Sequence, residues 1–153
     1  MAAPINSNAV LDYLVTLIAG WDIMQSAPIK GTPQAYKTTV SSHVNLAGFD
    51  VNANGSVGVL SILSRFHLTF AYKVGDVQST EAAETMIATL KDRFIKEWYT
   101  MRTDRMGGTV DSVSLIGNIT DSPDYRIMAG QEVRLYTIAL QCTQSECIMQ
   151  STR

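Results

Sequence analysis

The fold is decided between Arg65 and Tyr99, where the chain reads RFHLTFAYKVGDVQSTEAAETMIATLKDRFIKEWY. The first ten residues alternate between two kinds of side chain, a period that is typical of a β-strand with one buried face. The predicted buried face consists of Phe66, Leu68, Phe70, Tyr72 and Val74. The pattern therefore predicts a strand over residues 65–74.

Beyond Gly75 the spacing of apolar residues changes to three and four. The apolar positions are Ala83, Ile87, Leu90, Phe94 and Trp98. Such a stripe indicates a helix that packs on a sheet. A hydroxyl of Ser79 or Thr80 is suited to cap its first turn, so the helix is expected over residues 79–99. A strand followed by a covering helix indicates the α+β class.

Length and composition bound the rest of the fold. A chain of 153 residues is expected to form one domain, with residues 1–153 around a single core. Charged residues make up only 17% of the chain, against about 25% in ordinary soluble proteins, so some surface is expected to be covered by other subunits. The formal net charge of −2 argues against a general attraction to nucleic acid.

A first helix is predicted ahead of this stretch. Apolar residues recur at helical spacing from Val10 to Ile18, and Gly20 is a suitable stop, so the helix is expected over residues 7–19. Its N-cap stays open among three neighbouring polar residues, Asn6, Ser7 and Asn8. This apolar run is too short to span a bilayer. With no signal-peptide pattern before it, a soluble, cytoplasmic protein without a membrane partner is expected.

The connection that follows and the next pair of strands differ sharply in pattern. Pro28 and Pro33 interrupt residues 21–43, where a short strand over residues 21–24 is the most that is expected. Next, two apolar runs flank Asn54-Gly55, a strong hairpin signal. An extended hairpin is therefore expected over residues 44–63. Whether its second arm continues into residues 65–74 stays open.

The C-terminal third is expected to complete a mixed, mainly antiparallel sheet packed by two helices. Strands are predicted over residues 109–120 and 132–142, and a further strand is expected to begin over residues 125–128. The polar residues 143–153 are expected to form a frayed, flexible tail.

The search for reactive groups gives a negative answer. His43 and His67 stand 24 residues apart without partners at metal-ligand spacing. The chain has no nucleophile elbow, and its glycine-rich turn lacks the lysine of a phosphate loop. No catalytic residue, cofactor or metal is therefore predicted, and the protein is not expected to be an enzyme. Cys142 and Cys147 are expected to be free thiols, although a bridge between them stays open.

Two charge patterns bear on binding. The run Arg93, Lys96, Arg102 and Arg105, interleaved with aromatic residues, has the composition of a nucleic-acid surface, but acidic residues among them reduce the local charge. The opposite pattern holds from residue 38 to residue 64, where Asp50 is the only charged residue. Exposed hairpins normally carry charges that prevent edge pairing. Burial against a neighbour and solvation by Asn, Ser and Thr alone are equally open explanations.

With this order of elements, the chain resembles the tail terminator proteins of long-tailed bacteriophages. The shared features are the N-terminal helix, the proline-containing connection over residues 27–36, the strand RFHLTFAY (residues 65–72), the helix that starts AAETMI (residues 82–87), the sequence GGTV (residues 107–110), and the last strand VRLYTIAL (residues 133–140). The resemblance covers most of the chain and consists of a pattern of elements rather than an invariant motif.

The resemblance implies a structural protein of the virion, located in the tail or neck and assembled in the host cytoplasm. Proteins of this family form a homo-oligomeric ring, usually of six subunits, that caps the tail tube, ends its polymerisation and joins the tail to the head. The implied partners are like subunits, the tail tube protein and a head-tail connector protein, with genomic DNA only passing through the lumen. The family offers no catalytic residues.

The charge-poor hairpin is the expected subunit interface. The candidate residues on its arms are Phe49, Val51, Val57 and Val59. Two alternatives remain within the same class, a tail tube subunit and another neck or head-tail connector protein. An alternative of another class is a small ligand-binding or enzymatic α+β domain, in which the helix over residues 79–99 covers a pocket.

Overall fold

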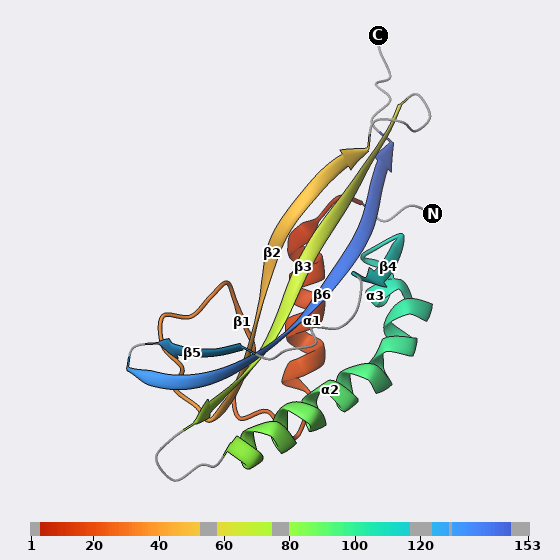
Figure 1. Ribbon diagram of the computed structural model, residues 1–153. Coiled ribbons are helices and arrows are strands. Elements are labelled where there is room, and N and C mark those ends of the chain that lie inside the picture. The colour runs from red at the N-terminus through yellow and green to blue at the C-terminus, as the bar shows by residue number, and fades with distance from the viewer. Residues whose placement is uncertain (1–3, 53–57, 75–79, 117–123, 129, 148–153) are drawn as a thin grey trace.

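The computed structural model describes residues 4–52, 58–74, 80–116, 124–128 and 130–147. In these residues a six-stranded mixed sheet carries its long helices on one face (Figure 1), so the expected α+β class is confirmed. The elements are α1 (Ser7–Ala19), β1 (Ile29–Lys30), β2 (Val40–Asn52), β3 (Val59–Val74), α2 (Thr80–Thr103), α3 (Arg105–Gly108), β4 (Ser112–Leu115), β5 (Asp124–Met128) and β6 (Gln131–Cys147).

Three long antiparallel strands dominate the sheet. Its order is β1-β2-β3-β6-β4, with β5 beside the other half of β6, and β1 alone runs parallel to its neighbour. β2 and β3 are the arms of the expected hairpin, whose turn residues 53–57 lie outside the described residues. The open question about the second arm is answered, because β3 runs without a break through the strand predicted over residues 65–74.

The main core lies between the sheet and the two long helices. Phe66, Leu68 and Phe70 of β3 are fully buried there, as the alternating pattern predicts. Their partners from the helices include Leu14 and Ile18 of α1 together with Leu90 and Phe94 of α2. The alternating pattern predicts only one buried face of the sheet. The opposite face also carries a smaller buried cluster, formed by Tyr36, Ala71, Val133 and Leu135.

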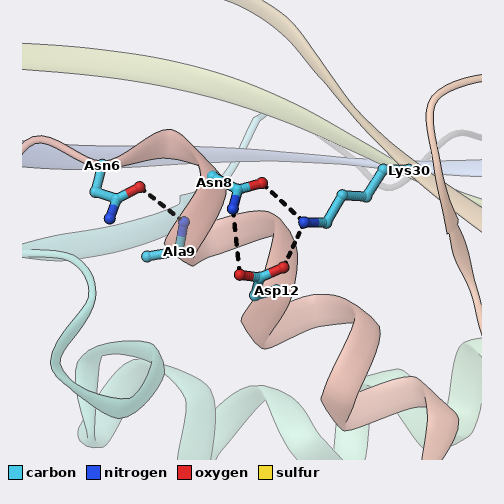
Figure 2. Close-up of polar contacts among 5 residues, drawn as sticks. All are labelled: Asn6, Asn8, Ala9, Asp12 and Lys30. Atoms are coloured by element: carbon cyan, nitrogen blue, oxygen red, sulfur yellow. Dashed lines mark hydrogen bonds and ion pairs between the residues drawn. The ribbon is translucent and has the colours of Figure 1, made fainter.

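Helix α1 is held at both ends, as its sequence predicts. The Asn6 carboxamide accepts a hydrogen bond from the Ala9 amide, which identifies the N-cap, and Gly20 is the C-cap. Figure 2 shows a second anchor, in which Lys30 of β1 donates to Asn8 Oδ1 over 2.8 Å and pairs with Asp12. These groups are exposed, so the contact contributes only tenths of a kcal/mol. Its effect is to fix β1 against α1.

Helix α2 and the turn after it differ from the predicted bounds. The helix extends to Thr103, four residues beyond the expected end, and residue 79 lies outside the described residues. The Asp104 side chain then caps the short α3, in which Arg105 and Met106 have positive φ. Such φ values are strained in residues other than glycine. Full burial of the Met106 side chain offsets that strain.

Three predicted strands have other bounds. The strand expected over residues 109–120 begins only at Ser112, since residues up to 111 complete the turn after α3, and residues 117–120 lie outside the described residues. The strand expected over residues 21–24 is wrong, because a turn stands there and the strand of this connection is β1. The strand expected from residue 125 is present as β5.

The predicted tail is also wrong in its first five residues. Residues 143–147 continue β6, where they pair with residues 59–63 of the hairpin. Their polar side chains face partners rather than a core: Gln144 donates to the backbone oxygens of Asn6 and Thr109, and Ser145 donates to Asp111. Residues 148–153 lie outside the described residues.

Candidate interaction surface

A β-bulge decides which way the hairpin presents its apolar side chains. Leu46 lies opposite Phe66 and Gly48 lies opposite Arg65, so Ala47 is an extra residue in β2. Side chains of a strand alternate between faces, and one extra residue therefore shifts all later positions to the other face. Phe49 thus comes to lie opposite Ser64, on the same face of the sheet as Leu46.

Three apolar residues gather on this face of β2, namely Leu46, Phe49 and Val51, and we call them the hairpin face. They share a side of the sheet with the core and the helices, but the hairpin projects past the N-terminal end of α1 (Figure 1). Their exposed fractions are 42% for Leu46, 60% for Phe49 and 52% for Val51. A cluster of large, exposed apolar side chains is typical of a surface that binds another protein.

The four predicted interface residues do not form one surface. Phe49 and Val51 lie on the hairpin face, whereas Val59, which is 39% exposed, lies on β3 opposite Cys147 and projects from the other side of the sheet. Val57 lies outside the described residues. Leu46 was missed, because only the bulge brings it onto one face with Phe49. The glycine after Ala47 was the single available signal, since glycine inside a strand often marks a bulge.

The hairpin is electrostatically neutral near this surface. Asp50 points to the opposite side from Phe49, and its Oδ2 lies 2.5 Å from Nη2 of Arg65. Both side chains are substantially exposed, so the pair contributes little to stability. The ion pair neutralises Asp50, the only charged residue between residues 38 and 64. An apolar partner at the hairpin face would therefore not have to cover an unpaired charge of this segment.

The outer edge of β2 lies next to the hairpin face. β1 pairs only with His43 and Val44 of β2, and in the described part of the chain no strand covers the outer edge from residue 45 to residue 52. Unpaired strand edges carry free backbone donors and acceptors that another chain can use. Apolar side chains and a free edge together indicate a surface for association.

The candidate reactive groups are held in structural roles. His43 is buried, its Nε2 lies 3.1 Å from the Tyr36 hydroxyl, and burial lowers its pKa below the ordinary value. Burial raises the pKa of Cys142 to about 12. Cys142 and Cys147 are both free, as expected, and they lie on opposite faces of β6. Among the described residues, no group of three or more His, Cys, Asp or Glu side chains is arranged to hold a metal ion.

The basic run spans α2 and α3, and Arg93 within it has contacts of its own. Arg93 pairs with Glu97 at 3.2 Å and stacks over the Trp21 ring, 5.4 Å from its centroid. The exposed Arg102 and Arg105 lie near Asp104, which caps α3. Arg93 therefore acts in packing α2 against the N-terminal region.

None of the helices in the described residues has the length and apolar character needed to cross a membrane. In comparisons with known proteins, neither a protein-family model nor a curated protein matches the chain.

Proposed function

We propose that this protein is a structural subunit of a phage virion that forms a closed ring, caps the tail tube, ends its polymerisation and joins the tail to the head. The hairpin face carries the proposal: three exposed apolar side chains on a neutral, projecting hairpin with an open strand edge. The resemblance of the sequence to tail terminators supplies the biological setting.

A ring places specific demands on its subunits. Each subunit must present two different surfaces that bind each other, and the rotation between neighbours must close. The hairpin face supplies one such surface, away from the core that holds the subunit together. The proposed partners are five further copies, the tail tube protein and a head-tail connector protein. Genomic DNA passes through the lumen, which is compatible with a chain of net charge −2.

Two alternatives of the same class predict different assemblies. A tail tube subunit stacks without limit, so purified protein would form long tubes in electron micrographs, whereas a terminator forms discrete rings. A different neck or head-tail connector protein also forms a ring, but its loss would leave tails of normal length with finished ends.

The ligand-binding or enzymatic alternative requires a pocket beneath the helix predicted over residues 79–99. Fully buried Phe70, Leu90 and Phe94 pack between the sheet and α2. Among the described residues this interface is therefore filled by side chains, which favours the structural role.

The test uses a phage-producing host in which the gene is deleted and then supplied in trans. Deletion is expected to give unjoined heads together with tails of uncontrolled length, and the natural gene is expected to restore whole particles. A gene encoding the double variant Phe49→Asp and Val51→Asp is expected to fail. Whole particles in the deletion host without any supplied gene would overturn the proposal.

A further inference from the structure

The loop over residues 25–39 is joined to the rest of the chain largely by contacts at the surface. The hydroxyls of Ser26 and Thr38 lie 3.4 Å apart and are exposed. The Lys30 anchor to α1 is exposed as well (Figure 2), and β1, within the loop, pairs with only two residues of β2. Exposed polar contacts of this kind contribute little to stability.

Burial of the loop depends mainly on one large side chain. Within residues 25–39 only Pro28 and Tyr36 are buried, and Tyr36 packs with Ala71 of β3. A cavity of about 450 Å³, lined in part by Ser41 and Ser42, separates the loop from β2, so the loop does not pack on this strand over its whole length. Segments with few buried contacts open at a lower free-energy cost than unfolding of the whole chain.

Tyr36 covers a buried imidazole. Its hydroxyl lies 3.1 Å from Nε2 of His43, and the two ring centroids are 6.2 Å apart. His43 is only 6% exposed, and its Nδ1 is buried without a hydrogen-bond partner in the described part of the chain. Protonation turns both ring nitrogens into donors and adds a charge. The closed loop therefore suits the neutral ring, and burial lowers the pKa of His43.

The surroundings of His43 offer no carboxylate to balance that charge. The loop contains no Asp or Glu over residues 25–39. The ionisable groups on the packed elements are Tyr36 and Lys37 of the loop, Lys30 of β1, and His67 and Lys73 on the same face of β3, while β6 places Leu135, Thr137 and Ala139 on this face. The nearest acidic side chains, Asp12 and Asp50, pair with Lys30 and Arg65. A charge on His43 would thus stay buried and uncompensated.

We propose that Tyr36 and His43 form a proton-sensitive latch, and that protonation of His43 opens the loop over residues 25–39 while the three long strands stay paired. Water reaches the imidazolium in the open loop, so acid favours the open form. Opening also removes β1 from the edge of β2, which adds His43 and Val44 to its uncovered stretch. The latch belongs to the single chain and does not depend on the proposed ring.

The experiment measures amide hydrogen exchange of the natural protein by NMR at pH 7.5 and pH 5.0, corrected for the intrinsic effect of pH on exchange. The reporter is the Gly31 amide, which donates to the Val44 oxygen over 2.7 Å. Its opening constant is expected to rise at least about threefold on acidification. The upper limit is about 30-fold, set by the ordinary pKa of 6.5 for His43 in the open loop.

Urea distinguishes opening of the loop from unfolding of the chain. Low urea concentrations are expected to leave the exchange of Gly31 unchanged, because opening the loop exposes little surface. Exchange of the Leu68 amide, in the middle of β3, is expected to accelerate with urea, because this amide requires unfolding of the sheet. Equal acceleration of both amides would overturn the inference.

Two variants remove the proton site. His43→Gln and His43→Leu carry no ionisable group, and in each the opening constant of the loop is expected to differ by less than about twofold between the two pH values. Ser26→Ala is the matched control: it removes an uncharged contact of the loop and is expected to raise the opening constant by the same factor at both pH values. A natural loop whose opening changes by less than twofold, or a pH response that persists in either folded His43 variant, would overturn the inference.

Discussion

Replacing Phe49 with serine is expected to weaken the association of subunits more than it lowers the stability of the single chain. A phenylalanine side chain buries roughly 150–250 Å² when it is fully covered. The 60% of Phe49 that is exposed in the single chain then amounts to roughly 90–150 Å². At about 25 cal/mol per Å² this surface contributes about 2–4 kcal/mol to each subunit contact, which corresponds to roughly a 40- to 600-fold change in the dissociation constant.

The free energy of unfolding of the single chain changes less. The part of Phe49 that is already covered amounts to roughly 60–100 Å² on the same scale, so the cost to folding is at most about 1.5–2.5 kcal/mol. The assay measures the two quantities separately: sedimentation velocity over a concentration series gives the association constant, and urea unfolding at low concentration gives the free energy of unfolding.

The matched control is Ile127→Ser on β5. Ile127 is even more exposed, at 79%, but it lies on another edge of the sheet and outside the proposed contact. Its replacement is expected to leave the association constant within about twofold. Equal weakening by both substitutions, or none by Phe49→Ser, would refute the reasoning that the hairpin face forms the contact.

Three further predictions concern the single chain. Tyr36→Phe removes the hydroxyl that lies 3.1 Å from His43 Nε2, and the unsatisfied buried nitrogen is expected to lower the free energy of unfolding by about 1–3 kcal/mol in urea titrations; an unchanged midpoint would contradict this role. Because burial lowers the pKa of His43, the unfolded chain binds the proton more readily. The free energy of unfolding is therefore undiminished above the ordinary pKa of 6.5. It declines as the pH falls from there toward the lower pKa of His43 in the folded chain. His43→Gln is expected to flatten that decline, and an unchanged slope would show that His43 is not responsible. At pH 8, iodoacetamide is expected to modify Cys147 but not Cys142, whose pKa is raised to about 12, until denaturant exposes both thiols; rapid double alkylation of the native chain, measured by mass spectrometry, would contradict it.

Local patterns predicted the elements in which one periodicity dominates. Alternation identified the buried face of β3 through Phe66, Leu68 and Phe70, and the helical stripe identified the packed side of α2. The Gly20 stop follows from backbone chemistry within one turn, whereas the choice of Asn6 among three candidate caps came from the structure. In each case the residues that carry the signal also make the contact.

The errors arose where distant residues decide the structure. Residues 143–147 lack an apolar pattern, yet they form a strand because residues 59–63 and Asp111 supply partners for their backbone and side chains. The end of α2 depends on the cap by Asp104 and on burial of Met106 in the core. Periodicity along the chain does not record such pairing.

The candidate surface was predicted only in part for the same reason. The absence of charge distinguishes the hairpin in the sequence, and Phe49 and Val51 are exposed on it. The bulge at Ala47 depends on the register with β3, so the grouping of Leu46 with Phe49 and the separation of Val59 became clear only from the pairing. The cavity beside Ser41 and Ser42 forms where the proline-containing loop returns to β2, which no short motif marks.

The mass of the purified natural protein, measured by native mass spectrometry and sedimentation from nanomolar to micromolar concentration, tests the central claim most directly. A closed ring is expected to appear as one discrete assembly in equilibrium with the 16.7-kDa chain, at about 100 kDa for six subunits, with no continuous series of larger species. A monomer at every concentration would contradict the account, because the hairpin face would then have no partner in a second copy.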